Sequence, residues 1–312
     1  MNSLAVIGAG AWGTALALHA HRAGLDVTLW SRHPIEGRIS PHLPGHALPP
    51  GIVLTTTLPA AEATLLVVPA QHLHDVASHL PGSGPVLVCA KGVEARRLLL
   101  PLEILAEAQP GRPAAILTGP NFAHEVAAGL PAASVVATSD PRLRAAFVAM
   151  LGTARFRLYG NDDPVGAQIG GAAKNVIAIA AGAVIGAGLG ENARAALITR
   201  GLAEIGRLAL ALGGRAETVA GLSGLGDLLL TCTGASSRNF RCGFALGRGE
   251  LLETAIAAAG GVVEGVATAP ALVARAADIE LPVCAAVAAL LAGQTTLPDA
   301  IAALMARPAR DE

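Results

Sequence analysis

The first half of the chain alternates short apolar runs with stretches of helical periodicity. The runs are continuously apolar rather than alternating, which is typical of parallel strands covered by helices on both faces. Because helical stretches separate them, we expect βαβ units with right-handed crossovers and a doubly wound sheet. The predicted strands are Leu4–Gly8, Val27–Trp30, Leu65–Pro69, Val86–Ala90, Ala115–Thr118, Ser134–Thr138 and Phe156–Tyr159.

The second half has a different texture. From Pro164 onward, Ala, Leu and Gly dominate and the β-rich runs disappear. Over Asn192–Leu212, polar side chains such as Glu204 recur opposite apolar ones at a helical period, and Gly213-Gly214 ends the pattern. The pattern therefore predicts an α/β domain over residues 1–163, followed by an all-helical domain over residues 164–312.

Composition narrows the classes of protein. The 312 residues suffice for two domains of about 150 residues each. A chain that is 53% hydrophobic and 14% charged is not disordered, and a net charge of -1 does not suit a nucleic-acid-binding protein. The longest uncharged apolar run, Val176–Gly190, is shorter than the ~20 residues that span a membrane, so it predicts a buried helix. The four cysteines lack metal-ligand spacing and no signal peptide precedes them, so we expect a cytoplasmic protein without membrane insertion.

A glycine-rich turn follows the first predicted strand. The segment Gly8-Ala9-Gly10-Ala11-Trp12-Gly13 leads directly into the helical stretch Thr14–Ala23. The glycines permit a tight turn and close approach to a pyrophosphate, and the helix N-terminus favours the phosphate charge. This context predicts a Rossmann-like dinucleotide site that includes Gly8, Gly10, Ala11, Trp12 and Gly13.

The end of the second predicted strand bears on the choice of cofactor. Sites for NAD usually place Asp or Glu there, whereas this chain has Ser31-Arg32-His33 and no carboxylate before Glu36. A guanidinium fits the 2′-phosphate of NADP, so we expect NADP (NADPH), with NAD as the second candidate. The alternative is that Arg32 is a solvated loop residue.

The chain contains two lysines, Lys91 and Lys174. Arg does not exchange a proton usefully near neutral pH, so a catalytic ammonium must come from one of these two. Lys174 lies in an Ala- and Gly-rich segment where desolvation lowers the pKa of an amine, although a lysine extending from a helix end fits the same pattern. All nine histidines lie between His19 and His124, which leaves none in the helical domain, and none is predicted to bind a metal.

A third constellation is Asp227 followed by Ser236-Ser237-Arg238-Asn239. Serine before a helical run (Phe240–Gly247) can cap that helix, and a guanidinium beside the helix N-terminus favours a phosphate. An ordinary cap with a surface arginine explains this segment equally well.

Seven segments together resemble one family, the bacterial NAD(P)-dependent glycerol-3-phosphate dehydrogenases, over nearly the whole chain. The stretch between Arg32 and Pro50 is shorter than is usual in that family. The matching segments are GAGAWGTALA, AKGVE, GPNFAHE, GGAAKNVIAIAAG, NARAALITRGLAEIGRL, GLSGLGDLLLTCTGASSRN and VVEGVATA.

The resemblance implies reversible reduction of dihydroxyacetone phosphate to sn-glycerol 3-phosphate, a precursor of phospholipids, by a homodimer. It implies that Lys174 is the catalytic residue, which protonates the developing alkoxide. It places the substrate against Lys91, Gly119, Asn121, Lys174, Asp227, Ser237, Arg238 and Asn239. It places the cofactor against Gly8, Gly10, Ala11, Trp12, Gly13, Arg32, His33, Lys91, Ala123, Arg238, Val262 and Glu264.

Two other functions are consistent with the fold. One is NADP-dependent reduction of ketopantoate or a related β-hydroxyacid, whose substrates carry no phosphate and leave Ser237, Arg238 and Asn239 unexplained. The other is a catalytically inactive nucleotide sensor, against which the joint presence of Lys91, Lys174 and Asp227 speaks.

Overall fold

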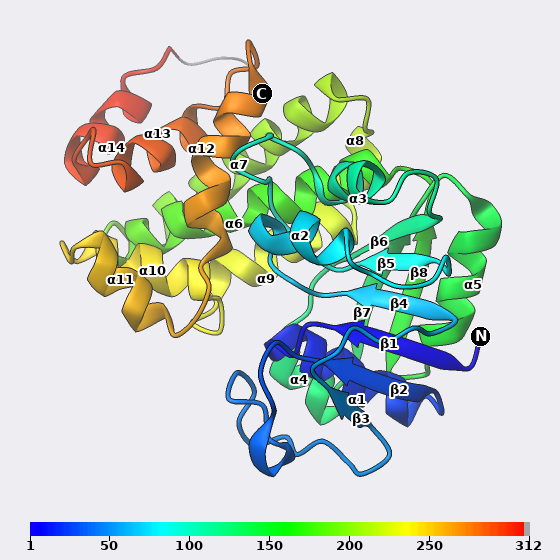
Figure 1. The fold of residues 1–312 in the computed structure, drawn as a ribbon. Coiled ribbons are helices and arrows are strands. Elements are labelled where there is room, and N and C mark those ends of the chain that lie inside the picture. Colours follow the sequence, from blue (N-terminus) through cyan, green and yellow to red (C-terminus); the bar gives the residue numbers. More distant parts are fainter. Residues whose placement is uncertain (309–312) are drawn as a thin grey trace.

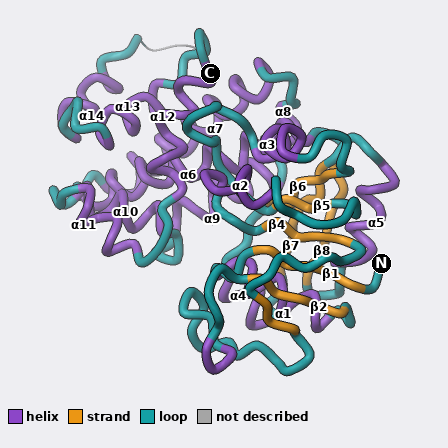
Figure 2. The backbone as a smooth tube through the Cα atoms, viewed as in Figure 1, coloured by secondary structure: helices purple, strands orange, loops and turns teal. Residues whose placement is uncertain are grey.

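A computed structural model of the chain describes residues 1–308, which form a sheet domain and a helical domain side by side (Figures 1 and 2). The sheet has eight strands in the order β3-β2-β1-β4-β5-β6-β7-β8. Neighbouring strands are parallel except β6 and β7, which are antiparallel. The strands are β1 (Ser3–Ile7), β2 (Asp26–Trp30), β3 (Val53–Thr55), β4 (Ala63–Leu66), β5 (Val86–Val88), β6 (Ala114–Thr118), β7 (Ala132–Ala137) and β8 (Phe156–Asn161).

The predicted doubly wound sheet is confirmed, with two corrections. The strand β3 was not predicted, because three residues at the edge of the sheet give no recognisable apolar run. The expectation of a wholly parallel sheet is wrong, since β7 and β8 run opposite to the others. Local composition cannot reveal this reversal, because both faces of β7 lie in the same apolar surroundings as those of its neighbours.

Alternate residues of β1 belong to different cores, which explains the continuously apolar runs. Leu4 and Val6 pack toward one face and Ala5 and Ile7 toward the other, and all four are buried. The first face is covered by α1 (Ala11–Arg22), α4 (Ala123–Ala128) and α5 (Pro141–Leu151). The second is covered by α2 (Leu73–Ala77) and α3 (Pro101–Ala108), with single turns η1 (Glu36–Arg38) and η2 (Ala70–His72) in the loops.

The helical domain is built around α6 (Pro164–Gly186), whose start is capped by the side chain of Asp163. Its glycines let other helices approach closely, since a Cβ at Gly182 would lie 2.1 Å from the carbonyl oxygen of Phe240. The surrounding elements are α7 (Gly190–Ala211), α8 (Ala216–Ala220), the π-helical turn η3 (Leu222–Gly226), α9 (Asp227–Thr233), α10 (Arg238–Gly247), α11 (Leu252–Ala259), α12 (Glu264–Ala276), α13 (Pro282–Leu291) and α14 (Leu297–Met305).

The helix α6 is long and apolar enough to cross a membrane, judged by length and composition alone, but 89% of its most apolar window is buried inside the protein. It is thus the buried helix predicted from the apolar run, although it starts earlier and ends at Gly186. No other helix in the described part of the chain reaches that length and hydropathy.

Candidate active site

The two lysines of the chain meet on one carboxylate. Lys91 lies in the loop after β5, Lys174 lies in the middle of α6, and Asp227 is the first residue of α9. The Lys91 Nζ atom lies 2.6 Å from Asp227 Oδ2, and Lys174 Nζ forms an ion pair with Asp227 Oδ1. Asp227 is completely buried. One carboxylate therefore joins an ammonium of the sheet domain to an ammonium of the helical domain.

The surroundings of Lys174 tune its proton affinity. Burial, opposed by the negative charge of Asp227 and assisted by the positive charge of Lys91, lowers the pKa of Lys174 to about 8. The Nζ atom also donates to Thr231 Oγ1 at 3.0 Å, and that hydroxyl donates to the carbonyl oxygen of Asp227 at 2.6 Å. This lysine is charged near neutral pH but holds its proton weakly enough to transfer it.

Thr231 is a site residue that the sequence reading missed. It lies four residues after Asp227 in α9, so both side chains share one face of the helix. That spacing was visible in the sequence. What was not visible is that this face meets Lys174, because the contact depends on how α9 packs against α6.

The loops at the carboxyl ends of the strands complete this part of the site. Lys91 Nζ donates to the carbonyl oxygen of Gly119 at 3.1 Å, and Asn121 Nδ2 donates to Ser134 Oγ at 2.5 Å. The amide oxygen of Asn121 and the hydroxyl of Thr118 are buried and have no partner among the described residues. Neither of these two polar atoms is engaged by the described residues.

Gly171 of α6 keeps space open at the same place. A Cβ at this position would lie 2.9 Å from Thr118 Oγ1 and 3.6 Å from the Cγ atom of Lys91. The absence of a side chain therefore leaves room between α6 and Lys91.

Ser237 caps α10, as the sequence predicted. Its hydroxyl accepts from the backbone N–H of Phe240 at 3.2 Å. Arg238 is exposed and forms no hydrogen bond or ion pair with the described residues, so its guanidinium is available to an anion. The two alternatives for this segment, a cap and an anion site, are therefore compatible.

Both polar atoms of the Asn239 side chain form hydrogen bonds within the protein. Its amide nitrogen donates to Asn175 Oδ1 at 2.9 Å, and its amide oxygen accepts from the backbone N–H of Gly265 at 2.9 Å. The side chain is buried and links α6, α10 and the start of α12. Its predicted substrate contact would require one of these bonds to be exchanged.

The glycine-rich turn has the geometry that a dinucleotide needs. Gly8 has φ +116°, and a Cβ at Gly13 would lie 1.7 Å from the carbonyl oxygen of Gly8, so both glycines are required by the chain itself. Gly10 is different, because a Cβ there would meet nothing within 4 Å. Open space thus lies beside the N-terminus of α1, which begins at Ala11 and Trp12. The residues present fit a pyrophosphate.

Arg32 and His33 follow β2 at the surface, and both are exposed. The hydroxyl of Ser31 donates to the carbonyl oxygen of His33 at 2.6 Å and shapes the turn that carries Arg32. Arg32 forms no hydrogen bond or ion pair with any described residue. The structure leaves both of its predicted roles open.

The remaining cofactor candidates come from α4 and α12. Ala123 is the first residue of α4, and Glu264 is the first residue of α12. Val262 is exposed. Burial raises the pKa of Glu264 to about 7, and Arg238 acts against this shift. Glu264 Oε2 lies 3.5 Å from the point that a Cβ on Gly92 would occupy, so α12 contacts the loop that carries Lys91.

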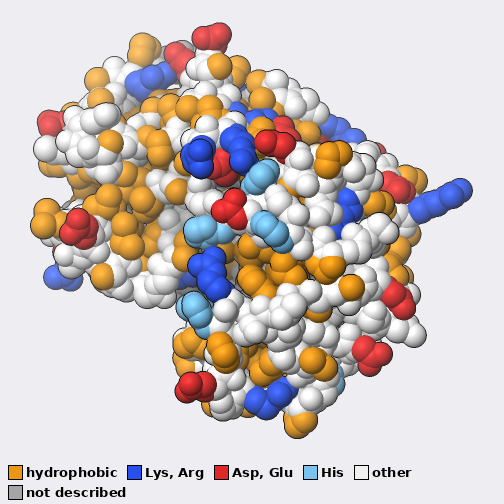
Figure 3. Space-filling model, in the orientation of Figure 1, with side chains coloured by type: hydrophobic (Ala, Val, Ile, Leu, Met, Phe, Trp, Pro, Cys, Tyr) orange, Lys and Arg blue, Asp and Glu red, His pale blue; other side chains and the backbone are white. Residues whose placement is uncertain are grey.

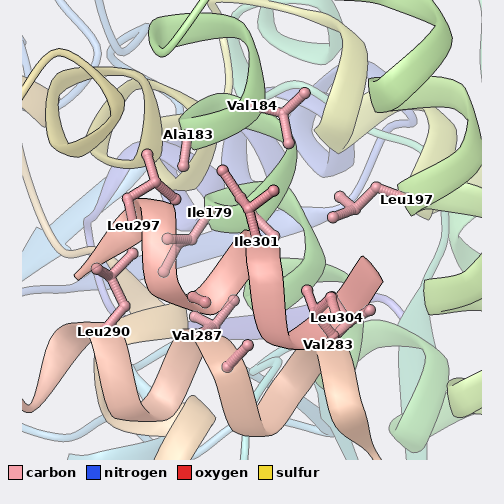
Figure 4. A pocket seen from close by; sticks show the side chains of 13 residues that line it. Ile179, Ala183, Val184, Leu197, Val283, Val287, Leu290, Leu297, Ile301 and Leu304 are labelled. Atoms are coloured by element: carbon pink, nitrogen blue, oxygen red, sulfur yellow. The ribbon is translucent and has the colours of Figure 1, made fainter. Parts of the chain in front are cut away.

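Surface features agree with a site between the domains. Basic and His side chains gather in a band across the middle of the face shown in Figure 3, where the two domains meet. A separate pocket in the helical domain is lined only by apolar side chains from α6, α7, α13 and α14 (Figure 4). None of the side chains that line it is titratable. Within the described residues, no group of three His, Cys, Asp or Glu side chains is placed to hold a metal ion.

Comparisons with known proteins agree along the whole chain. The family described as NAD-dependent glycerol-3-phosphate dehydrogenase matches with its N-terminus at residues 3–144 and its C-terminus at residues 163–302. A glycerol-3-phosphate dehydrogenase (NAD(P)+) of Acidiphilium cryptum is 56% identical over 317 residues, which cover 99% of this chain and 98% of that protein. The crystal structure of glycerol-3-phosphate dehydrogenase from Coxiella burnetii matches with a TM-score of 0.94 at 36% identity, over 98% of this chain and 99% of that one.

The ketopantoate alternative finds support only at the level of the fold. A 2-dehydropantoate 2-reductase from Geobacter metallireducens matches with a TM-score of 0.61 at 16% identity, over 94% of this chain and 100% of that one. The expected resemblance, the two-part fold and the enzyme class are confirmed by the closer relatives. This chain belongs to the family of NAD(P)-dependent glycerol-3-phosphate dehydrogenases.

Proposed function

We propose that this protein uses NADPH to reduce dihydroxyacetone phosphate to sn-glycerol 3-phosphate, reversibly, with Lys174 as the proton donor. The observation that carries the proposal is the buried bridge from Lys174 through Asp227 to Lys91. The bridge assembles two ammonium groups where the sheet domain and the helical domain meet. The site suits an oxygen atom that gains negative charge during the reaction.

When bound, a nicotinamide cofactor would supply the hydride that the C2 carbonyl of the substrate accepts. Lys174 donates its proton to the oxygen that becomes the alkoxide, and in the reverse direction it removes that proton. Asp227 keeps Lys174 charged before transfer, and Thr231 fixes its Nζ atom at 3.0 Å. Lys91, together with Gly119 and Asn121, orients the substrate and stabilises negative charge on it.

Arg238 and the N-terminus of α10 bind the phosphate of the substrate, together with Ser237 and Asn239. The guanidinium forms no hydrogen bond or ion pair with the described residues and matches the fork geometry of phosphate oxygens. Asn239 joins after one of its two hydrogen bonds rearranges. A phosphate held at this end places C2 in a fixed position relative to Lys174.

The turn from Gly8 to Gly13 would hold the cofactor, and Arg32 would give the preference for NADPH over NADH. The exposed guanidinium of Arg32 binds the 2′-phosphate, with His33 beside it. The rest of the cofactor would be held by Ala123, Val262, Glu264 and Arg238. Lys91 faces cofactor and substrate together.

Three broader statements belong to the same proposal. The product supplies the backbone of phospholipids. The protein acts in the cytoplasm, which is supported by four cysteines that are free and buried. It acts as a homodimer, which is supported by apolar side chains at the surface of the helical domain, among them Leu210, Leu229 and Leu251.

The test compares three substrates of the wild-type protein with NADPH: dihydroxyacetone phosphate, dihydroxyacetone and ketopantoate. We expect oxidation of NADPH with dihydroxyacetone phosphate and very little with the other two. Equal rates with dihydroxyacetone phosphate and dihydroxyacetone would show that the protein does not use a phosphate site. Turnover with ketopantoate alone would establish the alternative function.

A further inference from the structure

The segment that follows Lys91 is shared between the two domains. Residues 91–100, here called the lysine loop, have no helix or strand and lead from β5 to α3. Val93 and Leu100 of this loop are buried, and both belong to the hydrophobic core of the helical domain. The loop that carries Lys91 therefore follows a strand of the sheet domain and packs partly into the core of the helical domain.

The far end of the lysine loop is held by one arginine of α12. Arg275 donates to the carbonyl oxygen of Leu98 at 2.6 Å and to Glu103 Oε1 at 2.7 Å. Glu103 Oε2 in turn accepts from the backbone N–H of Leu100 at 2.7 Å. The Arg275 side chain is 18% exposed and the Glu103 side chain 41%, so the arginine is mostly buried while the carboxylate is partly open to water.

The backbone at Leu98, where Arg275 binds, has an unusual conformation. Leu98 has φ +60°, a left-handed conformation that a bulky residue rarely adopts. Such conformations persist only where surrounding contacts fix them. The contacts of Arg275 with the carbonyl oxygen of Leu98 and with Glu103 are therefore specific fixing points of the loop.

The same helix also contacts the near end of the lysine loop. A Cβ on Gly92 would lie 2.9 Å from Thr268 Oγ1 and 3.5 Å from Glu264 Oε2. Gly92, with φ +151°, directly follows Lys91. The helix α12 thus runs along the loop, from Gly92 at one end to Leu98 at the other.

We propose that Arg275 is a positioning residue for Lys91: it fixes the lysine loop to α12 and so holds the Lys91 ammonium against Asp227. Lys91 Nζ lies 2.6 Å from Asp227 and 3.1 Å from the carbonyl oxygen of Gly119. A loop released at Leu98 loses the far anchor of the backbone that carries this side chain. The ammonium then withdraws from Asp227.

Withdrawal of Lys91 has a signature at the other lysine. The groups that face Lys174 are Asp227, Thr231 and Cys232 from α9 and Lys91 from the loop. Of these, Lys91 alone moves with the loop. Because its positive charge is one cause of the lowered pKa of Lys174, its withdrawal raises that pKa.

The test uses the presence of only two lysines in the chain. Lysine labelled with ¹³C at Cε gives two side-chain signals in NMR spectra, and their titration reports both ammonium groups without any need for turnover. We expect the pKa of Lys174 to rise in Arg275→Met. The matched control is Arg97→Met, an arginine of the same loop whose exposed ion pair with Glu107 spans 3.7 Å, and it should titrate like the wild type.

Kinetic measurements on the same variants rest on the proposed function. With dihydroxyacetone phosphate, Arg275→Met should lower kcat by about ten- to a hundredfold, while NADPH affinity stays within about twofold. Reduction needs protonated Lys174, so its rate falls as pH rises through the pKa of that lysine, and this fall should occur at higher pH in Arg275→Met. Arg275→Lys should restore part of the rate. If Arg275→Met does not fold, Glu103→Gln should show a smaller shift of the Lys174 pKa in the same direction.

An unchanged Lys174 titration in a folded Arg275→Met protein would overturn the inference. So would equal losses of kcat and NADPH affinity, because these would mean that α12 supports the fold in general. A wild-type protein that does not reduce dihydroxyacetone phosphate would refute the proposed function instead, and the NMR titration would still decide the role of Arg275.

Discussion

Replacing Asp227 by Asn removes the negative charge that lies between two ammonium groups. Asp227 is completely buried, and its two oxygens contact Lys91 and Lys174 separately. Asparagine has nearly the same shape but cannot balance either charge. Because Asp227 raises the pKa of Lys174, its loss should lower that pKa below the value of about 8 that Lys174 has in the wild type.

The size of the shift follows from the burial of the pair. Breaking a buried ion pair by removing one partner costs about 3–5 kcal/mol. One pKa unit corresponds to about 1.4 kcal/mol, so even if the two lysines share this energy, the pKa of Lys174 falls by at least about one unit. Reduction of the substrate needs the protonated amine, so its rate falls as pH rises through this pKa. In Asp227→Asn, the falling limb should therefore move to lower pH.

The assay is the rate of NADPH oxidation with dihydroxyacetone phosphate from about pH 6 to about pH 9. At neutral pH, Asp227→Asn should lose at least about a hundredfold in kcat, with partial recovery on acidification. Asp162→Asn serves as the control, since that carboxylate is exposed and pairs with Arg215 outside the site. A limb that stays at the wild-type pH, or moves upward, would refute this account of how Asp227 acts.

Three further predictions concern single side chains. Arg32→Ala should weaken the binding of NADPH relative to that of NADH by roughly ten- to a hundredfold, because a charge-assisted bidentate contact contributes about 1.5–3 kcal/mol. If the dissociation constants of both cofactors rise equally, Arg32 has a structural role instead. Arg238→Ala should discriminate far less than the wild type between dihydroxyacetone phosphate and dihydroxyacetone in kcat/KM, and unchanged discrimination would place the phosphate elsewhere. Glu204 is 1% exposed and accepts from the backbone N–H groups of Val283 and Cys284 at 2.6 and 3.1 Å, so Glu204→Ala should lower the free energy of unfolding by about 2–5 kcal/mol in denaturant titrations. The exposed Glu253→Ala is its control, and a loss no larger than that of the control would contradict this role.

The sequence predicted those features that depend on neighbouring residues. The glycine turn, the strand before it and α1 after it form one local unit, and the structure contains that unit. The cap of α10 by Ser237 is equally local. The start of α6 was harder to predict from the sequence. Asp163 and Pro164 are a cap and a first helical residue, but the packing of the helix is also needed to identify them as its start.

Features that depend on long-range packing were not predictable. The reversal of β7 relative to β6 leaves no trace in the composition of either strand. Thr231 belongs to the site only because α9 packs against α6. The amide of Asn239 is engaged by Asn175 and Gly265, residues 64 and 26 positions away in the chain. In each case the determining contact joins segments whose proximity the sequence does not specify.

The most direct test of the central claim is the turnover of Lys174→Ala with NADPH and saturating dihydroxyacetone phosphate. Because general acid catalysis contributes about 10²–10⁴ in rate, we predict a loss of kcat of at least that order, with NADPH affinity unchanged. Lys174→Arg should not restore the rate, because a guanidinium holds its proton too tightly. A variant that keeps a tenth or more of the wild-type kcat would contradict the assignment of Lys174 as the proton donor.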